Sequence, residues 1–196
     1  MISLKLLILI LLCCLFIRYK TKDVRKKSKS YNVFYSTDIF PILKYFENSW
    51  YQIFNEANNI SSHHYAIPNF DRVNEKIIDY VIMENDYLMG RNSQLCPVTS
   101  SLLSQFKGVL LAKFVILKPF SISSIQKTSF NQKTLISYCL GISIPQDSLV
   151  KLYSSHNAMN IIANRSFIYD SSYPFYIENQ SNYEDAIIFC VDIIKS

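Results

Sequence analysis

The chain has 196 residues, and 49% of them are hydrophobic, which is enough apolar material for the core of one folded domain. Three glycines and six prolines beside 14 tyrosines and 13 phenylalanines exclude a collagen-like or disordered chain. The net charge of +5 comes largely from a basic run near the N-terminus, so the composition does not indicate nucleic-acid binding.

The chain begins with an apolar run, residues 1–19, which we interpret as a membrane anchor. A helix of about 20 apolar residues crosses a bilayer, and basic residues stand where a signal peptide would have a small-residue cleavage site. We therefore expect an uncleaved signal-anchor, a single transmembrane helix followed by a basic juxtamembrane stalk over residues 20–32. The centre of this helix would be Leu6, Leu7, Ile8, Leu9, Ile10, Leu11 and Leu12.

Two membrane topologies are possible for the rest of the chain. Seven basic residues stand between Ile17 and Ser30, and only Lys5 stands near the N-terminal end of the run, which favours a cytoplasmic C-terminal domain under the positive-inside rule. Alternatively, the basic stalk contacts lipid headgroups and the domain is translocated.

Residues 33–196 predict one α+β domain. Apolar residues at helical spacing predict an amphipathic helix over residues 38–57, followed by a polar loop over 55–70. A strand is expected at 75–83 and a short helix at 100–106. Further short apolar or β-branched runs predict strands at 109–117, 134–144, 149–153, 159–162, 166–169 and 186–193. This order of elements favours a β-sandwich or barrel with helices packed outside it.

The five cysteines do not form a recognisable framework. Cys13 and Cys14 lie in the apolar run, while Cys96, Cys139 and Cys190 lie in the domain. Three thiols cannot all pair with one another, and the chain has no CxxC spacing, so we predict neither a disulfide framework nor a zinc site.

Four stretches, in order, resemble the aspartyl/asparaginyl β-hydroxylase family. They are residues 34–56 with Glu-Asn-x-Trp, residues 96–119 with Cys-Pro-x-Thr, residues 140–145 with Leu-Gly, and the closing block 168–192. The resemblance covers residues 33–196. It implies a double-stranded β-helix, a jelly roll of the cupin type with flanking helices, and an oxygenase that uses Fe(II) and 2-oxoglutarate.

The resemblance also implies where five chemical groups should stand, and this chain has another residue at each position. The family groups are two iron-binding histidines, an Arg and a His that serve the cosubstrate, and a second Arg. Their positions are taken, in that order, by Gln126 or Thr128, Phe175, Ser137, Cys139 and Asp185. A phenyl ring has no lone pair for iron, and a hydroxyl cannot replace a bidentate guanidinium. We therefore expect no catalytic residue, no bound metal and no cofactor.

The predicted function is that of a membrane-anchored, catalytically inactive relative of the hydroxylases that binds a protein partner. The abundance of Ile, Asn, Lys, Ser and Tyr is typical of AT-rich genomes such as those of large DNA viruses, which favours a viral membrane protein.

Two alternatives stand beside this prediction. The first is an active dioxygenase with Fe(II) and 2-oxoglutarate at a displaced site, built from His63, His64 or His156 beside Asp170 or Asp185. The second is an unrelated, anchored, β-rich envelope or structural protein.

Overall fold

The structure, a computed structural model, describes residues 33–63, 76–126, 135–146, 149–155 and 157–194. The expected anchor, residues 1–19, and the basic stalk, residues 20–32, lie outside the described residues. Within the described ranges, no helix is long and apolar enough to cross a membrane.

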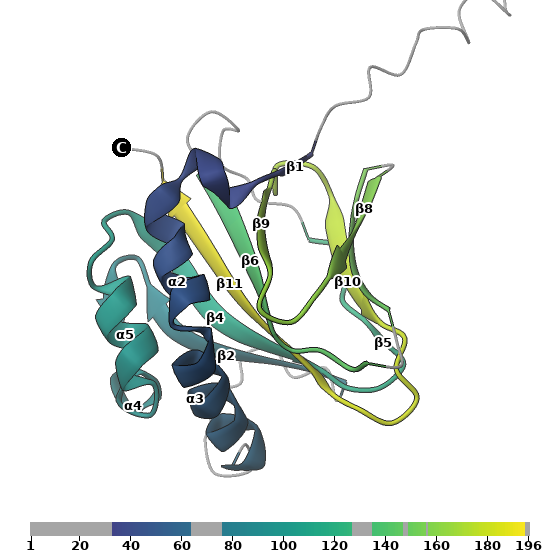
Figure 1. The fold of residues 1–196 in the computed structure, drawn as a ribbon, viewed down its shortest axis with the longest axis horizontal. Coiled ribbons are helices and arrows are strands. Elements are labelled where there is room, and N and C mark those ends of the chain that lie inside the picture. Colours follow the sequence, from purple (N-terminus) through teal and green to yellow (C-terminus); the bar gives the residue numbers. More distant parts are fainter. Residues whose placement is uncertain (1–32, 64–75, 127–134, 147–148, 156, 195–196) are drawn as a thin grey trace, which may run out of the picture. The chain divides into compact units, whose positions relative to one another are not determined.

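The described strands form two antiparallel sheets that face each other (Figure 1). The seven-stranded sheet contains, from edge to edge, β1 (Phe34–Tyr35), β9 (Ser166–Tyr169), β6 (Leu135–Ser143), β11 (Ala186–Ile194), β4 (Val109–Leu117), β2 (Ile77–Glu84) and β3 (Tyr87–Leu88). The four-stranded sheet contains β5 (Ser121–Ile122), β10 (Phe175–Asn179), β7 (Val150–Ser154) and β8 (Asn157–Ile161).

From β4 onward the chain winds back and forth between the two sheets. Strands β4, β6, β9 and β11 lie in the larger sheet, and β5, β7, β8 and β10 lie in the smaller one. This alternation is the winding of a double-stranded β-helix, so the expected jelly roll with flanking helices is confirmed.

Burial explains why some strands are uniformly apolar and others alternate. In β6 all seven residues between the two terminal ones are buried, because helices cover one face of this strand and the small sheet covers the other. In β7 and β10 every second residue is buried, because only one face of the small sheet packs on the core.

Four short α-helices cover the outer face of the larger sheet (Figure 1). They are α2 (Lys44–Asn48), α3 (Trp50–His63), α4 (Gly90–Gln94) and α5 (Pro97–Leu103). Helix α3 contacts β6, while α4 and α5 contact β2. Their buried side chains and one face of the larger sheet form the first hydrophobic core.

The helix expected at residues 38–57 is wrong in its detail. Two 3-10 turns, η1 (Thr37–Ile39) and η2 (Pro41–Leu43), come before α2, and Ser49 separates α2 from α3. Helix α3 continues to His63, so the loop expected from residue 55 is wrong for residues 55–63. The polar residues there hide an apolar stripe that continues through buried Ala57 and Ile60.

Gly141 on β6 is a point where three segments meet. The indole Nε1 of Trp50 donates a hydrogen bond of 2.9 Å to the Gly141 carbonyl oxygen, which joins α3 to β6. The same oxygen accepts a hydrogen bond of 3.0 Å from the backbone N–H of Asn164. A Cβ atom at position 141 would lie 2.2 Å from the carbonyl oxygen of Ile162, which is part of the backbone and cannot swing aside.

Gly141→Ala is therefore expected to destabilise the domain by roughly 3 kcal/mol, the upper end of the range for overpacked cores. Because Trp50 is the single tryptophan of the chain, its fluorescence should change in the folded variant. Urea unfolding followed by fluorescence measures both effects.

Gly90→Ala is the control for this variant. Gly90 has a φ of +37°, and a Cβ atom at this position would meet no other atom within 4 Å. The variant should therefore lose only about 1–2 kcal/mol of stability through backbone strain, and Trp50 fluorescence should not change. Equal stability losses and unchanged fluorescence in both variants would contradict the steric account.

Candidate functional site

Gln126 and Phe175, the positions that the family resemblance assigns to the iron-binding histidines, lie next to each other. The backbone N–H of Gln126 donates to the carbonyl oxygen of Phe175 at 2.8 Å, and the Phe175 N–H donates to the Gln126 oxygen at 2.9 Å. This isolated antiparallel bridge makes the two residues direct partners, whose side chains share one face of the ladder. Two ligands of one metal would need such a placement. Thr128, the other candidate, lies outside the described residues.

The Phe175 side chain is part of the hydrophobic core between the two sheets. Only 7% of its surface is exposed, and its ring packs edge-on against Tyr169 with centroids 5.1 Å apart. Phe167 and Phe34 extend this aromatic contact toward β1. At the position that the resemblance assigns to an iron ligand, the structure therefore has an apolar ring buried in the interior.

Strand β10, which carries Phe175, was not predicted from the sequence. Phe175, Ile177 and Asn179 are buried and alternate with the less buried Tyr176 and Glu178. This alternation was a usable signal for a half-buried strand.

Cys139, at the position that the resemblance assigns to the assisting histidine, also faces the space between the sheets. It is fully buried in the same core as Phe175, and it lies directly opposite Cys190 on β11. Burial raises the pKa of the Cys139 thiol well above its usual value, followed in size by the hydrogen bond with Cys190. The thiol is therefore neutral at physiological pH and is a poor ligand for iron.

Ser137, at the position that the resemblance assigns to the cosubstrate arginine, contacts an acidic side chain. Its hydroxyl donates to Oδ1 of Asp192 at 2.6 Å and lies 2.6 Å from the Ser171 hydroxyl. Burial raises the pKa of Asp192, while the hydrogen bond from Ser137 and the charge of Lys113 act in the opposite direction. Ser137 therefore has a hydroxyl that is already hydrogen-bonded to a carboxyl group, where a carboxylate of 2-oxoglutarate would need a positive charge.

Asp185, at the position that the resemblance assigns to the second arginine, forms an ion pair. Its Oδ2 lies 2.6 Å from Nζ of Lys118, and the two side chains are 28% and 30% exposed. The negative charge that the sequence places here is therefore offset by a lysine 67 residues away.

The displaced metal site remains a prediction. His64 and His156 lie outside the described residues, and for His63 only the backbone, at the end of α3, is described. Asp170 accepts a hydrogen bond of 3.1 Å from the backbone N–H of Ser172, as expected for a turn aspartate. Among the residues that the structure describes, no group of three His, Cys, Asp or Glu side chains could hold a metal ion.

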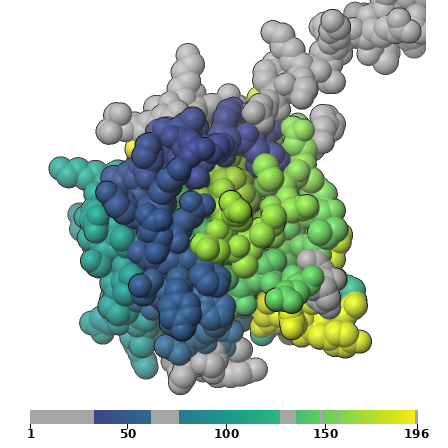
Figure 2. All heavy atoms as spheres, in the orientation of Figure 1, coloured from purple at the N-terminus to yellow at the C-terminus, as the bar shows by residue number. Residues whose placement is uncertain are grey.

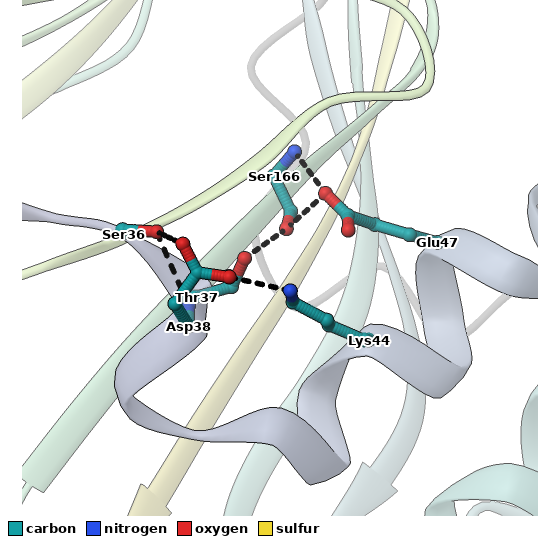
Figure 3. Close-up of polar contacts among 6 residues, drawn as sticks. All are labelled: Ser36, Thr37, Asp38, Lys44, Glu47 and Ser166. Atoms are coloured by element: carbon teal, nitrogen blue, oxygen red, sulfur yellow. Dashed lines mark hydrogen bonds and ion pairs between the residues drawn. The ribbon is translucent and has the colours of Figure 1, made fainter.

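Glu47 of the Glu-Asn-x-Trp motif joins the N-terminal helices to the jelly roll (Figure 3). Its Oε1 accepts hydrogen bonds from the backbone N–H of Ser166 at 2.9 Å and from the Ser166 hydroxyl at 2.7 Å. The Ser166 hydroxyl also lies 3.4 Å from that of Thr37. Viewed from outside, the purple and blue atoms of the helices abut the green atoms before β9 (Figure 2).

Thr99 of the Cys-Pro-x-Thr motif has a comparable structural role. Its backbone N–H and hydroxyl donate to Oε2 of Glu56 at 3.1 and 2.6 Å, and the Val98 N–H donates to Oε1 at 2.6 Å. The carboxylate of Glu56 thus binds the N-terminus of α5 from within α3. This role was not predicted from the sequence, although Thr99 stands directly before the predicted short helix.

Comparison with known proteins gives one family match. Residues 47–196 match the sequence model described as aspartyl/asparaginyl beta-hydroxylase. No curated protein matches the chain. Similar solved structures include a prolyl-4-hydroxylase from Pseudomonas putida, with 10% identity, a TM-score of 0.47 and coverage of 75% of this chain and 88% of that one. Another is ectoine synthase from P. lautus, with 8% identity, a TM-score of 0.42 and coverage of 68% and 75%.

Phe175→Ala is expected to lower the free energy of unfolding by about 3–5 kcal/mol, because it leaves a cavity between the sheets. The matched control is Phe120→Ala, where the ring is 62% exposed and the loss should stay within about 0.5 kcal/mol. Urea unfolding measures both changes. Equal, small losses in the two variants would mean that Phe175 does not support the core.

Asp192→Asn should change how stability depends on pH. Because the folded state raises the pKa of Asp192, it binds this proton more tightly than the unfolded state does. The contribution of Asp192 to stability is therefore full below the ordinary value of 3.8 and is lost as the pH rises through the raised pKa. Asparagine does not titrate, so the stability of the variant relative to the natural protein should rise with pH in this window.

Asp38→Asn is the control with the opposite sign. A hydrogen bond from Lys44 lowers the pKa of Asp38, so its contribution is present above 3.8 and is lost as the pH falls. Urea unfolding at a series of pH values compares the two variants. The same direction of change in both would contradict the assignment for Asp192.

Proposed function

This chain belongs to the aspartyl/asparaginyl β-hydroxylase family, and from this premise we propose that it is a membrane-anchored member that does not catalyse hydroxylation and that binds a protein partner. The observation that carries the proposal is the burial of Phe175 against Tyr169 at the inferred position of an iron ligand. The fold is retained while the inferred chemical groups are replaced, and the two properties are separable.

The residues present at the inferred site do not fit Fe(II) and 2-oxoglutarate. Phe175 offers no lone pair, and the thiol of Cys139 is held neutral by burial. Ser137 donates its hydrogen bond to Asp192 instead of presenting a positive charge to a carboxylate. We therefore derive no reaction step through either group.

The membrane and binding parts of the proposal rest on other features. The apolar run of residues 1–19 supports an anchor. The abundance of Ile, Asn, Lys, Ser and Tyr, typical of AT-rich genomes, supports a viral source. Ile39, Ile42 and Tyr45 are 56%, 45% and 52% exposed and recur every three residues along η1, η2 and α2. Exposed apolar side chains of this kind offer contact area to a partner protein.

Iron retention and succinate formation by the full chain in detergent test the loss of catalysis. After anaerobic incubation with Fe(II), we expect far less than one iron per chain. With 2-oxoglutarate, oxygen and peptides that contain Asp or Asn, we expect no succinate above the protein-free blank. An active oxygenase assayed in parallel is the positive control, and one iron per chain with turnover would overturn the proposal.

A further inference from the structure

Cys139 and Cys190 are placed as the two halves of a disulfide. They are direct partners across the antiparallel ladder between β6 and β11. Directly opposite residues in such a ladder have Cα atoms about 4.5–5.5 Å apart, which falls inside the range of about 4.4–6.8 Å found for disulfides. The Cβ atoms of directly opposite residues are about 4.5–5.5 Å apart, so a local approach of roughly 1 Å brings them into the range of about 3.5–4.5 Å found for disulfides.

The side chains as well as the backbones meet. Both residues belong to the core between the two sheets, so their Cβ atoms point to the same side of the larger sheet. The two thiols and the phenol ring of Tyr169 are neighbours in this core. The third thiol of the domain, Cys96, is buried in the separate core beneath the helices.

We propose that Cys139 and Cys190 form a cross-strand disulfide when the protein folds under oxidising conditions, and that Cys96 stays a free thiol. Each cysteine gives up its thiol hydrogen as one proton and one electron, and the two sulfur atoms become bonded. The oxidant is a small-molecule or enzyme disulfide, which takes the two electrons and two protons and is released as two thiols. Three thiols cannot all pair, but this arrangement needs only two.

The timing of the reaction follows from burial. Cys139 has no exposed surface and Cys190 only 9%, so a bulky oxidant cannot reach the pair in the folded protein. Both cysteines also lie on β6 and β11, neighbouring strands in the middle of the larger sheet. Local unfolding rarely separates strands in such a position. The bond should therefore form during folding and be slow to form or to be reduced afterwards.

The experiment is oxidative refolding of the reduced full chain in detergent with a glutathione redox buffer, with Cys13→Ser and Cys14→Ser in the background. Free thiols are then alkylated and the peptides are identified by mass spectrometry. We expect the peptides of Cys139 and Cys190 to be linked, with a loss of two hydrogens, and Cys96 to be alkylated. The linked form should have a higher urea midpoint than the reduced form.

Two variants test whether the link is specific to Cys139 and Cys190. Cys96→Ala, the matched control, should retain both the link and the difference in midpoint, while Cys190→Ala should leave Cys139 alkylated and abolish the difference. If Cys190→Ala does not fold, peptide mapping of the protein with both cysteines still decides. Alkylation of both Cys139 and Cys190 in oxidatively refolded protein with native circular dichroism would overturn the proposal, as would a link to Cys96. The outcome is independent of the iron and succinate assays.

Discussion

The burial of β6 and β11 on both faces is the constraint on which the rest of the structure depends. On one face Tyr138 and Phe189 pack beneath the helices, and on the other Cys139 and Cys190 pack against the small sheet. Neither strand has a face that can accept an unpaired charge without cost, because each side is a hydrophobic core. Every side chain that points inward from these strands must therefore be apolar, neutral or hydrogen-bonded.

This constraint accounts for the side chains that stand at the positions that the resemblance assigns to the iron ligands and cosubstrate residues. A metal site would require polar ligands in the space between the sheets, together with a path for solvent. With phenylalanine and cysteine at those positions, the same space becomes continuous with the core. Asp192 is the exception, and its raised pKa records the cost of burying a carboxyl group that has only partial compensation from Ser137 and Lys113.

The motifs that resemble the family are held by contacts of a different kind. Glu47, Trp50 and Glu56 each form hydrogen bonds to backbone or side-chain groups far away in the sequence. Removing one partner of such a buried contact leaves a polar group without compensation, which costs more than the contact itself contributes. These residues hold the helices on the sheet, so their retention follows from folding and carries no information about catalysis.

The amino-acid sequence by itself determined the five longer strands of the larger sheet to within two residues and the placement of their apolar faces, whereas the two-residue strands β1 and β3 were not predicted. Strands β4 and β9 have the predicted bounds, because a strand buried on two sides is a continuous apolar run. Only the tertiary structure decided that α3 extends to His63, that Lys118 pairs with Asp185, and that Cys139 lies against Cys190. These features depend on segments that are distant along the chain, and local periodicity reports which face of a segment is buried but not what covers it.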